Sequence, residues 1–206
     1  MLFETYGDSS HPAVLFFHAM GVTGLALVVA SSIGADLAMA FLTQTTHPAA
    51  HVFFDGGQFA RIGRGTRRIM TPFLYLAIKS LYWSKGGTLK KILWCDDGVI
   101  KPYFIAAGKA LTYGNLRSQL ADSLEDKPFP KLPEDLQRRT YFSFGSSEDH
   151  YKYREAVKKA YPAGNFPVFS GYDHMQYQIQ DPKGFAALLR CIVEQNTLPE
   201  LPFLSK

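Results

Sequence analysis

The sequence has few cysteines and none of the common cofactor motifs. Cys95 and Cys191 are its two cysteines and have no CxxC spacing, which argues against a disulfide framework. The six histidines show no HxH or HExxH pattern, so we expect no metal site. No phosphate-binding loop or dinucleotide fingerprint occurs either, and we expect no cofactor.

Long apolar runs are also missing. The longest, such as residues 25–30 and 73–78, are far shorter than the roughly 20 residues that span a bilayer. The first residues lack the basic and apolar stretches of a signal peptide. We therefore predict a chain without a transmembrane segment that resides in the cytoplasm. With 47% apolar and 19% charged residues, the composition is typical of a globular protein with a hydrophobic core.

Acidic residues are absent from one long interval, between Asp55 and Asp96. The basic residues within it are Arg61, Arg64, Arg67, Arg68, Lys79, Lys85, Lys90 and Lys91. A basic surface attracts nucleic acid, anionic lipid or an acidic substrate, or it is only the solvated face of helices. Because no nucleic-acid-binding motif accompanies it, we favour the solvated face and predict no nucleic-acid partner.

Short apolar runs alternate with helical segments along much of the chain. Runs typical of buried strands cover residues 13–17, 25–30, 51–54, 140–144 and 166–169. Helices are predicted over residues 35–42, 149–160 and 182–194. This alternation predicts an α/β fold with a mainly parallel sheet flanked by helices.

Residues 58–133 interrupt the alternation with an aromatic, basic and mostly helical segment. We interpret this segment as a helical lid, or cap, inserted into a core that residues 1–57 and 134–206 form together.

The first two apolar runs lie unusually close in the sequence. Seven residues separate the run that ends at Phe17 from the run that starts at Leu25. Neighbouring parallel strands need a crossover of a dozen or more residues. Either these strands are not neighbours, or a segment near residues 22–25 is absent, and we favour its absence.

A small-residue turn follows the second run. The sequence from Ala30 to Gly34 matches the G-x-S-x-G nucleophile elbow, with Ala30 in the first glycine position. A serine on such a strained strand-to-helix turn needs small residues two positions before and after it. We predict Ser32 as a nucleophile and the backbone N–H of Ile33 as an oxyanion donor. Alternatively, Ser31 and Ser32 only cap the following helix.

A second oxyanion donor is expected in the loop after the first run. Residues 18–21 (His-Ala-Met-Gly) resemble the His-Gly-x-Gly loop of esterases and lipases. The backbone N–H of Met20 is the candidate donor, with Ala19 second. We interpret the imidazole of His18 as structural, because the loop acts through its backbone.

A histidine and an acid complete the pattern. His174 follows the last predicted strand and precedes a helix, and it is the candidate base. Glu148, just after the strand at 140–144, is the first choice for the acid that orients the imidazole. Asp149 is the alternative acid, although it also suits a helix N-cap. Asp55 is a third option, and a site without an acid stays open.

The order serine, acid, histidine resembles the α/β-hydrolase superfamily of serine esterases and lipases. The resemblance covers residues 1–55 and 136–206. It rests on four short segments, residues 18–21, 30–34, 145–148 and 171–174. The family places a further strand and helices between the oxyanion loop and the elbow, and this sequence lacks them.

The resemblance implies a serine hydrolase that cleaves an ester, amide or similar bond through an acyl-enzyme. It also implies a small-molecule substrate. Aromatic residues of the predicted lid favour an apolar acyl or aromatic group on that substrate: Phe73, Tyr75, Tyr82 and Trp83. An acyltransferase and a non-catalytic ligand-binding protein on the same fold remain alternatives, and a homo-oligomer is open.

Overall fold

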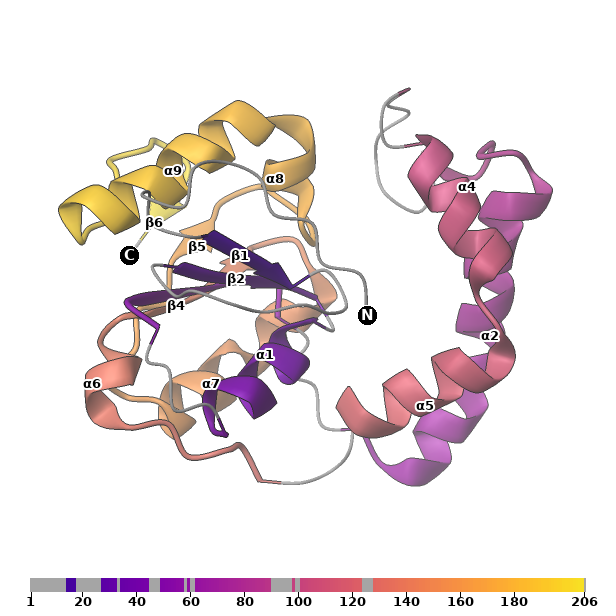
Figure 1. Cartoon of the computed structure of the whole chain (residues 1–206), viewed down its shortest axis with the longest axis horizontal. Coiled ribbons are helices and arrows are strands. Elements are labelled where there is room, and N and C mark those ends of the chain that lie inside the picture. Colours follow the sequence, from indigo (N-terminus) through magenta and orange to yellow (C-terminus); the bar gives the residue numbers. More distant parts are fainter. Residues whose placement is uncertain are drawn as a thin grey trace. The chain divides into compact units, whose positions relative to one another are not determined.

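Six strands form one sheet in the computed structural model of the chain (Figure 1). The strands are β1 Val14–Phe17, β2 Leu27–Ser31, β3 His51–Asp55, β4 Thr140–Gly145, β5 Val168–Phe169 and β6 Leu204–Ser205. They are ordered β1-β2-β3-β4-β5-β6; β1 to β5 are parallel, and β6 is antiparallel to β5. The predicted α/β fold with a mainly parallel sheet is therefore confirmed.

The structure describes residues 14–17, 27–32, 34–44, 49–57, 59, 62–89, 98, 101–123 and 128–205. The chain divides into two compact units. The first comprises Met1–Ala60 and Pro128–Lys206, and the second comprises Arg61–Lys127. Each unit is described separately below.

Helices cover both faces of the sheet in the first unit (Figure 1). They are α1 Gly34–Leu42, α6 Glu134–Gln137, the 3-10 helix η1 Asp149–Tyr153, α7 Arg154–Ala160, α8 Gln176–Gln180 and α9 Pro182–Gln195. Helices α1 and α7 pack on one face and α9 on the other, as the membership of two separate apolar clusters shows.

Alternate strand residues enter these two clusters. Phe54 of β3 packs on the face that α1 covers, whereas its neighbour Phe53 packs on the face that α9 covers. Phe142 and Tyr141 of β4 divide in the same way. Since side chains of a strand point alternately to its two faces, a sheet covered on both faces needs continuous apolar runs. This is why the strands read as unbroken apolar segments in the sequence.

Strands β1 and β2 are direct parallel neighbours, with Val14 opposite Leu27 and Phe17 opposite Ala30. The alternative that these two runs are not neighbours is therefore wrong. The predicted absence of a segment near residues 22–25 concerns a part of the chain outside the described residues.

The described part of the second unit is helical, with α2 Arg64–Trp83, α4 Lys101–Ala110 and α5 Tyr113–Ser123. Helix α2 packs against both α4 and α5. Gly108 of α4 lies so close to α2 that an added Cβ would stand 2.9 Å from the carbonyl oxygen of Ile78. Because glycine has no side chain, Gly108 permits the close approach of α4 and α2.

The second unit is shorter than the predicted insertion at 58–133. After residue 127 the chain returns to the first unit, where Leu132 and Leu136 join its core. Whether the helical unit acts as a lid stays a prediction. No helix among the described residues is long and apolar enough to cross a membrane.

Candidate active site

Ser32 lies in the tight turn between β2 and α1. Its φ angle is +54°, in the left-handed region that residues other than glycine seldom adopt. Its N–H donates to the carbonyl oxygen of Asp55 (3.1 Å), and its own carbonyl oxygen accepts from Ala35 (3.1 Å). The sequence folds this way because small residues, Ala30 and Gly34, flank the turn. Backbone strain held by hydrogen bonds is the hallmark of a nucleophile elbow.

A hydrogen-bonded chain links Ser32 to a histidine and a glutamate. Nε2 of His174 lies 3.0 Å from Oγ of Ser32, and Nδ1 lies 2.7 Å from Oε2 of Glu148. The side chain of Glu148 is fully buried, whereas that of His174 is 21% exposed. With its second oxygen, Glu148 accepts from the N–H of Gly145 at 3.2 Å. Both carboxylate oxygens are thus hydrogen-bonded, as a buried charge requires.

The topology of the sheet brings these three residues together. Ser32 follows β2, Glu148 follows β4 and His174 follows β5. Because β2 to β5 are parallel, their carboxyl ends share one edge of the sheet. Ligands of open α/β sheets bind at this edge. Residues scattered over more than 140 positions of sequence thereby meet within hydrogen-bonding distance.

The other candidate acids are placed differently. Asp149 is exposed and begins η1, and no hydrogen bond joins it to His174 within the described structure. Asp55 is buried at the end of β3, where its Oδ1 accepts from the hydroxyl of Ser143 at 3.0 Å. Burial raises the pKa of Asp55 to about 7, and the nearby carboxylate of Glu148 adds to the rise. Glu148 is therefore the carboxylate in contact with the imidazole.

The backbone passes close to the imidazole of His174 at Gly56, where no side chain stands between them. The φ angle of Gly56 is +55°, and an added Cβ would stand 2.7 Å from Nδ1 of His174 and 3.0 Å from Oε2 of Glu148. A side chain at this position would occupy the space of the His174–Glu148 hydrogen bond. The sequence gives the turn signal Asp-Gly-Gly here, but not its proximity to His174.

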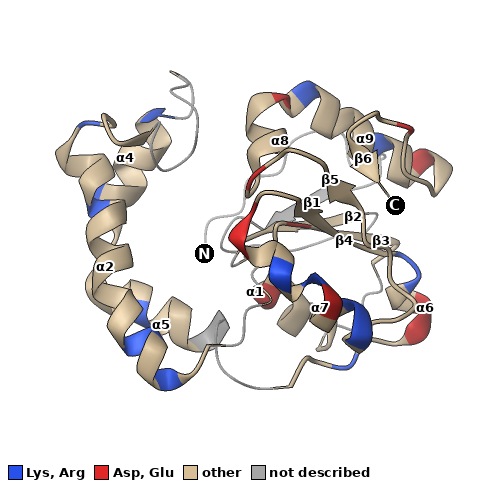
Figure 2. Cartoon of the chain, turned by 180° about the vertical axis from the view of Figure 1, so that it is seen from behind, with Lys and Arg blue, Asp and Glu red and all other residues tan. Residues whose placement is uncertain are grey.

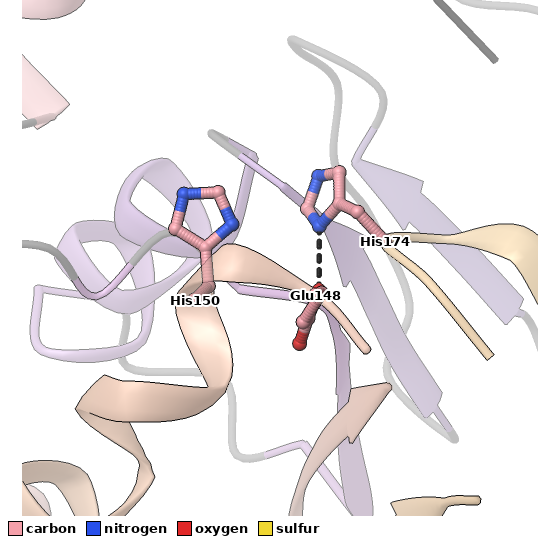
Figure 3. A group of neighbouring side chains, drawn as sticks. All are labelled: Glu148, His150 and His174. Carbon is pink, nitrogen blue, oxygen red and sulfur yellow. Dashed lines mark hydrogen bonds and ion pairs between the residues drawn. The ribbon is translucent and has the colours of Figure 1, made fainter. Parts of the chain in front are cut away.

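His150 is a neighbour that sequence reasoning did not single out. Its ring centroid lies 5.0 Å from that of His174, and Figure 3 shows both imidazoles beside Glu148. Burial lowers the pKa of His150 to about 4, and its Nδ1 is buried without a hydrogen-bond partner in the described structure. No spacing could have identified it, because its contact with His174 arises only from the fold.

These three side chains also form a set of metal-binding donors. Donor atoms of Glu148, His150 and His174 all lie within 4.8 Å of one another. Two imidazoles and a carboxylate are ligands that Zn²⁺ accepts. Glu148 and His174 are already bonded to each other, however, so a metal ion there would displace that hydrogen bond.

The predicted oxyanion donors, Ile33 and Met20, lie outside the described residues, as do His18 and Ala19. Their role stays a prediction. Helix α1, which begins at Gly34, places a helix N-terminus directly after Ser32. Such a terminus carries unpaired N–H groups and a partial positive charge, which favour a developing oxyanion.

The aromatic residues predicted to contact the substrate all belong to α2. Phe73, Tyr82 and Trp83 are exposed, whereas Tyr75 packs edge-on against Tyr113 of α5 at 5.6 Å between ring centroids. Their contact with a substrate stays a prediction.

Comparison with known proteins yields structural similarity alone. The sequence matches no protein-family model and no curated protein. The structure is similar to a carboxylesterase from the thaumarchaeon Nitrososphaera gargenis, with a TM-score of 0.53 and 15% identity over 83% of this chain and 66% of that one. For the carboxylesterase CesB from Bacillus subtilis, the TM-score is 0.52 and the identity 14%, over 83% and 60% of the two chains.

A third similar structure is MGS-M2, an α/β-hydrolase enzyme from a deep-sea metagenome library of the Medee basin. The TM-score is 0.54 and the identity 13%, over 86% of this chain and 68% of that one. The chain thus spans roughly two thirds of the length of the structures it resembles. At these identities the similarity concerns the fold and not the activity. Together with the mainly parallel sheet, it establishes that the chain has the α/β-hydrolase fold.

Proposed function

We propose that the protein is a serine hydrolase that cleaves an ester, amide or similar bond of a small molecule through an acyl-enzyme. The observation that carries the proposal is the hydrogen-bonded chain from Ser32 through His174 to the buried Glu148. A nucleophile, its base and the group that orients the base are thereby within hydrogen-bond reach of one another.

In the first step, Nε2 of His174 accepts the proton of the Ser32 hydroxyl while Oγ attacks the carbonyl carbon. The hydrogen bond to Glu148 fixes the proton of the neutral imidazole on Nδ1, which leaves Nε2 free to act as a base. When His174 becomes an imidazolium, the carboxylate stabilises its charge and remains ionised. The imidazolium then protonates the leaving alcohol or amine as the carbonyl–heteroatom bond breaks.

In the second step, water attacks the acyl group on Ser32. His174 takes a proton from this water, and it returns that proton to Oγ when the ester bond to Ser32 breaks. The carboxylic acid leaves and the starting state is restored. The N-terminus of α1, with its partial positive charge, is suited to stabilise the oxyanion of both tetrahedral intermediates.

Covalent labelling tests the proposal directly. The full chain is incubated with a fluorophosphonate probe, and the modified peptide is identified by mass spectrometry. We expect modification of Ser32, no modification in Ser32→Ala, and retained modification in the matched control Ser31→Ala. A wild-type protein that stays unlabelled, or equal labelling of Ser32→Ala, would contradict the proposal and favour a non-catalytic ligand-binding protein.

A panel of chromogenic esters with acyl chains of increasing length then defines the substrate class. An apolar acyl or aromatic group should raise kcat/KM. If the acyl-enzyme formed from these esters turned over only after addition of an alcohol or amine, the protein would be an acyltransferase instead.

A further inference from the structure

Four arginines surround a hollow between α2 and α5 in the second unit. Its volume is about 480 Å³, and it is lined by Arg64, Arg67, Arg68 and Arg117 together with the hydroxyl-bearing Thr71 and Tyr113. Figure 2 marks the positions of Lys and Arg along the ribbons of α2 and α5 in blue. None of the lining residues that the structure describes is acidic. All charged side chains among these lining residues are therefore guanidinium groups.

The arginines converge because of their positions on two packed helices. Arg64, Arg67 or Arg68, and Thr71 follow the spacing of three and four residues that places side chains on one helix face. Arg117 comes from α5, which packs against α2. Guanidinium groups repel one another and would diverge on an open surface. Here the packing of α2 against α5 places all four arginines along the same hollow.

Within the residues that the structure describes, no carboxylate pairs with these arginines. Arg67 is half-buried, and its Nη1 donates to the carbonyl oxygen of Ala121 at 3.3 Å, which ties it across to α5. Since a guanidinium stays charged at any physiological pH, the cluster attracts an anion.

The chemistry of the hollow selects the type of anion. A guanidinium offers a planar fork of N–H donors that matches two oxygens of a phosphate. Tyr113 adds a phenolic O–H, and its ring is positioned by the edge-on contact with Tyr75. A volume near 480 Å³ exceeds that of a single inorganic ion and lies in the range of small-molecule sites.

We propose that this arginine hollow binds a small organic molecule that carries one or more phosphate groups. The site lies entirely within the second unit and does not depend on the proposed hydrolase activity. Its test is therefore a binding measurement, and the result stands whether or not Ser32 reacts with a fluorophosphonate.

Titration calorimetry of the full chain with pyrophosphate, at low and at moderate salt, provides the first measurement. We expect saturable binding of one pyrophosphate per chain that weakens as salt rises. The variant Arg68→Gln/Arg117→Gln removes two exposed guanidinium groups and should weaken binding by at least about tenfold. The substitution Arg117→Lys keeps the charge but loses the fork, and it should weaken binding by a smaller factor.

The matched control is Arg190→Gln, which removes one exposed arginine of α9, outside the hollow. Its affinity for pyrophosphate should equal that of the wild type. An equal loss in Arg190→Gln and in the hollow variants would mean attraction by net charge alone and would overturn the proposal. Unchanged binding in Arg68→Gln/Arg117→Gln would overturn it as well.

A vesicle arm separates a soluble phosphate from a lipid headgroup. Sedimentation is measured with phosphatidylcholine vesicles with and without phosphatidic acid. Binding of pyrophosphate together with no co-sedimentation supports a soluble ligand. If the protein co-sedimented with phosphatidic acid vesicles but did not bind pyrophosphate, the proposal of a soluble ligand would be wrong.

Discussion

At the scale of single residues, the candidate site depends on groups that hold His174 in place as much as on the three side chains that form the chain of hydrogen bonds. Glu148 fixes one side of the imidazole, and the bare backbone of Gly56 leaves room for that contact. The buried Glu148 also shows why sequence alone left the acid open. Glu148 and Asp149 are adjacent in the chain, and only the turn after β4 decides which of them points to His174.

The substitution Gly56→Ala should disable the site while the fold persists. An added Cβ would press on His174 and Glu148, and a non-glycine residue at positive φ carries a strain of about 1–2 kcal/mol. Misplacement of a catalytic group by about 1 Å costs on the order of 100-fold in rate. We expect such a loss in kcat for an activated ester, with a circular dichroism spectrum like that of the wild type.

Gly63→Ala is the control for this prediction. An added Cβ at Gly63 meets nothing within 4 Å, and the residue is exposed. Its kcat should stay at the wild-type level. An active Gly56→Ala protein, within about threefold of wild type, would show that His174 does not need its present position.

Ser32 and His174 should act as one unit. Because the nucleophile is inert without its base, Ser32→Ala, His174→Ala and the double variant should all lose about the same factor, on the order of 10⁴ to 10⁶ in kcat. Steady-state hydrolysis of a chromogenic ester measures this. Losses that multiply in the double variant would mean that the two side chains act independently and would argue against the proposed mechanism.

At the scale of elements, the sequence predicts some parts of the site well and others not at all. The sequence predicts the order strand, turn, helix around Ser32, because small residues flank this serine and an apolar run precedes it. The strand at 166–169 is only two residues long in the structure, Val168–Phe169, since Pro167 has no N–H to donate to a sheet. The predicted helix at 149–160 begins as the 3-10 helix η1. This 3-10 helix places His150 beside His174, and the periodicity of the sequence does not predict that contact.

Helix α9 anchors one face of the sheet, and its start can be tested separately. The side chain of Asp181 accepts from the N–H of Gly184 at 2.9 Å, and Pro182 occupies the first turn. Asp181→Ala leaves that N–H without its cap and should lower the free energy of unfolding by about 1 kcal/mol. Urea unfolding followed by far-UV circular dichroism measures the change.

Lys183→Ala, at an exposed position two residues further along α9, serves as the control. It should change the free energy of unfolding by less than about 0.5 kcal/mol. If the two substitutions had the same effect, the cap would contribute nothing specific.

At the scale of the whole molecule, the sheet contains the strands that bring the three residues of the candidate site together. The four strands from β2 to β5 are consecutive in the sheet, and three of them precede Ser32, Glu148 and His174. The part of the fold that the chain shares with similar structures covers 60% to 68% of their length. The sequence predicts that a segment near residues 22–25 is absent, because a parallel crossover has a minimum length, and this stays a prediction. The direct pairing of β1 and β2 rules out only the alternative that the two runs are not neighbours.

The buried Asp55 ties the stability of the whole domain to pH. Its folded-state pKa is raised from 3.8 to about 7, chiefly by burial, with Glu148 raising it further while Ser143 and His174 oppose the rise. Between these two pH values the folded state holds a proton that the unfolded state has lost. The contribution of Asp55 to the free energy of unfolding therefore falls as pH rises from about 4 to about 7 and is constant above that.

Comparison of the wild type with Asp55→Asn isolates this contribution. Asparagine keeps an acceptor for Ser143 but never ionises, so the variant should gain stability relative to the wild type as pH rises, by an amount on the order of 4 kcal/mol between pH 4 and pH 8. The wild-type curve alone would mislead, because the lowered pKa of His150 acts with the opposite sign below pH 6.5. Urea midpoints of both proteins at several pH values supply the difference. If that difference were flat from pH 4 to pH 8, Asp55 would be ionised throughout, and the buried carboxyl beside Glu148 would carry its charge in the folded protein.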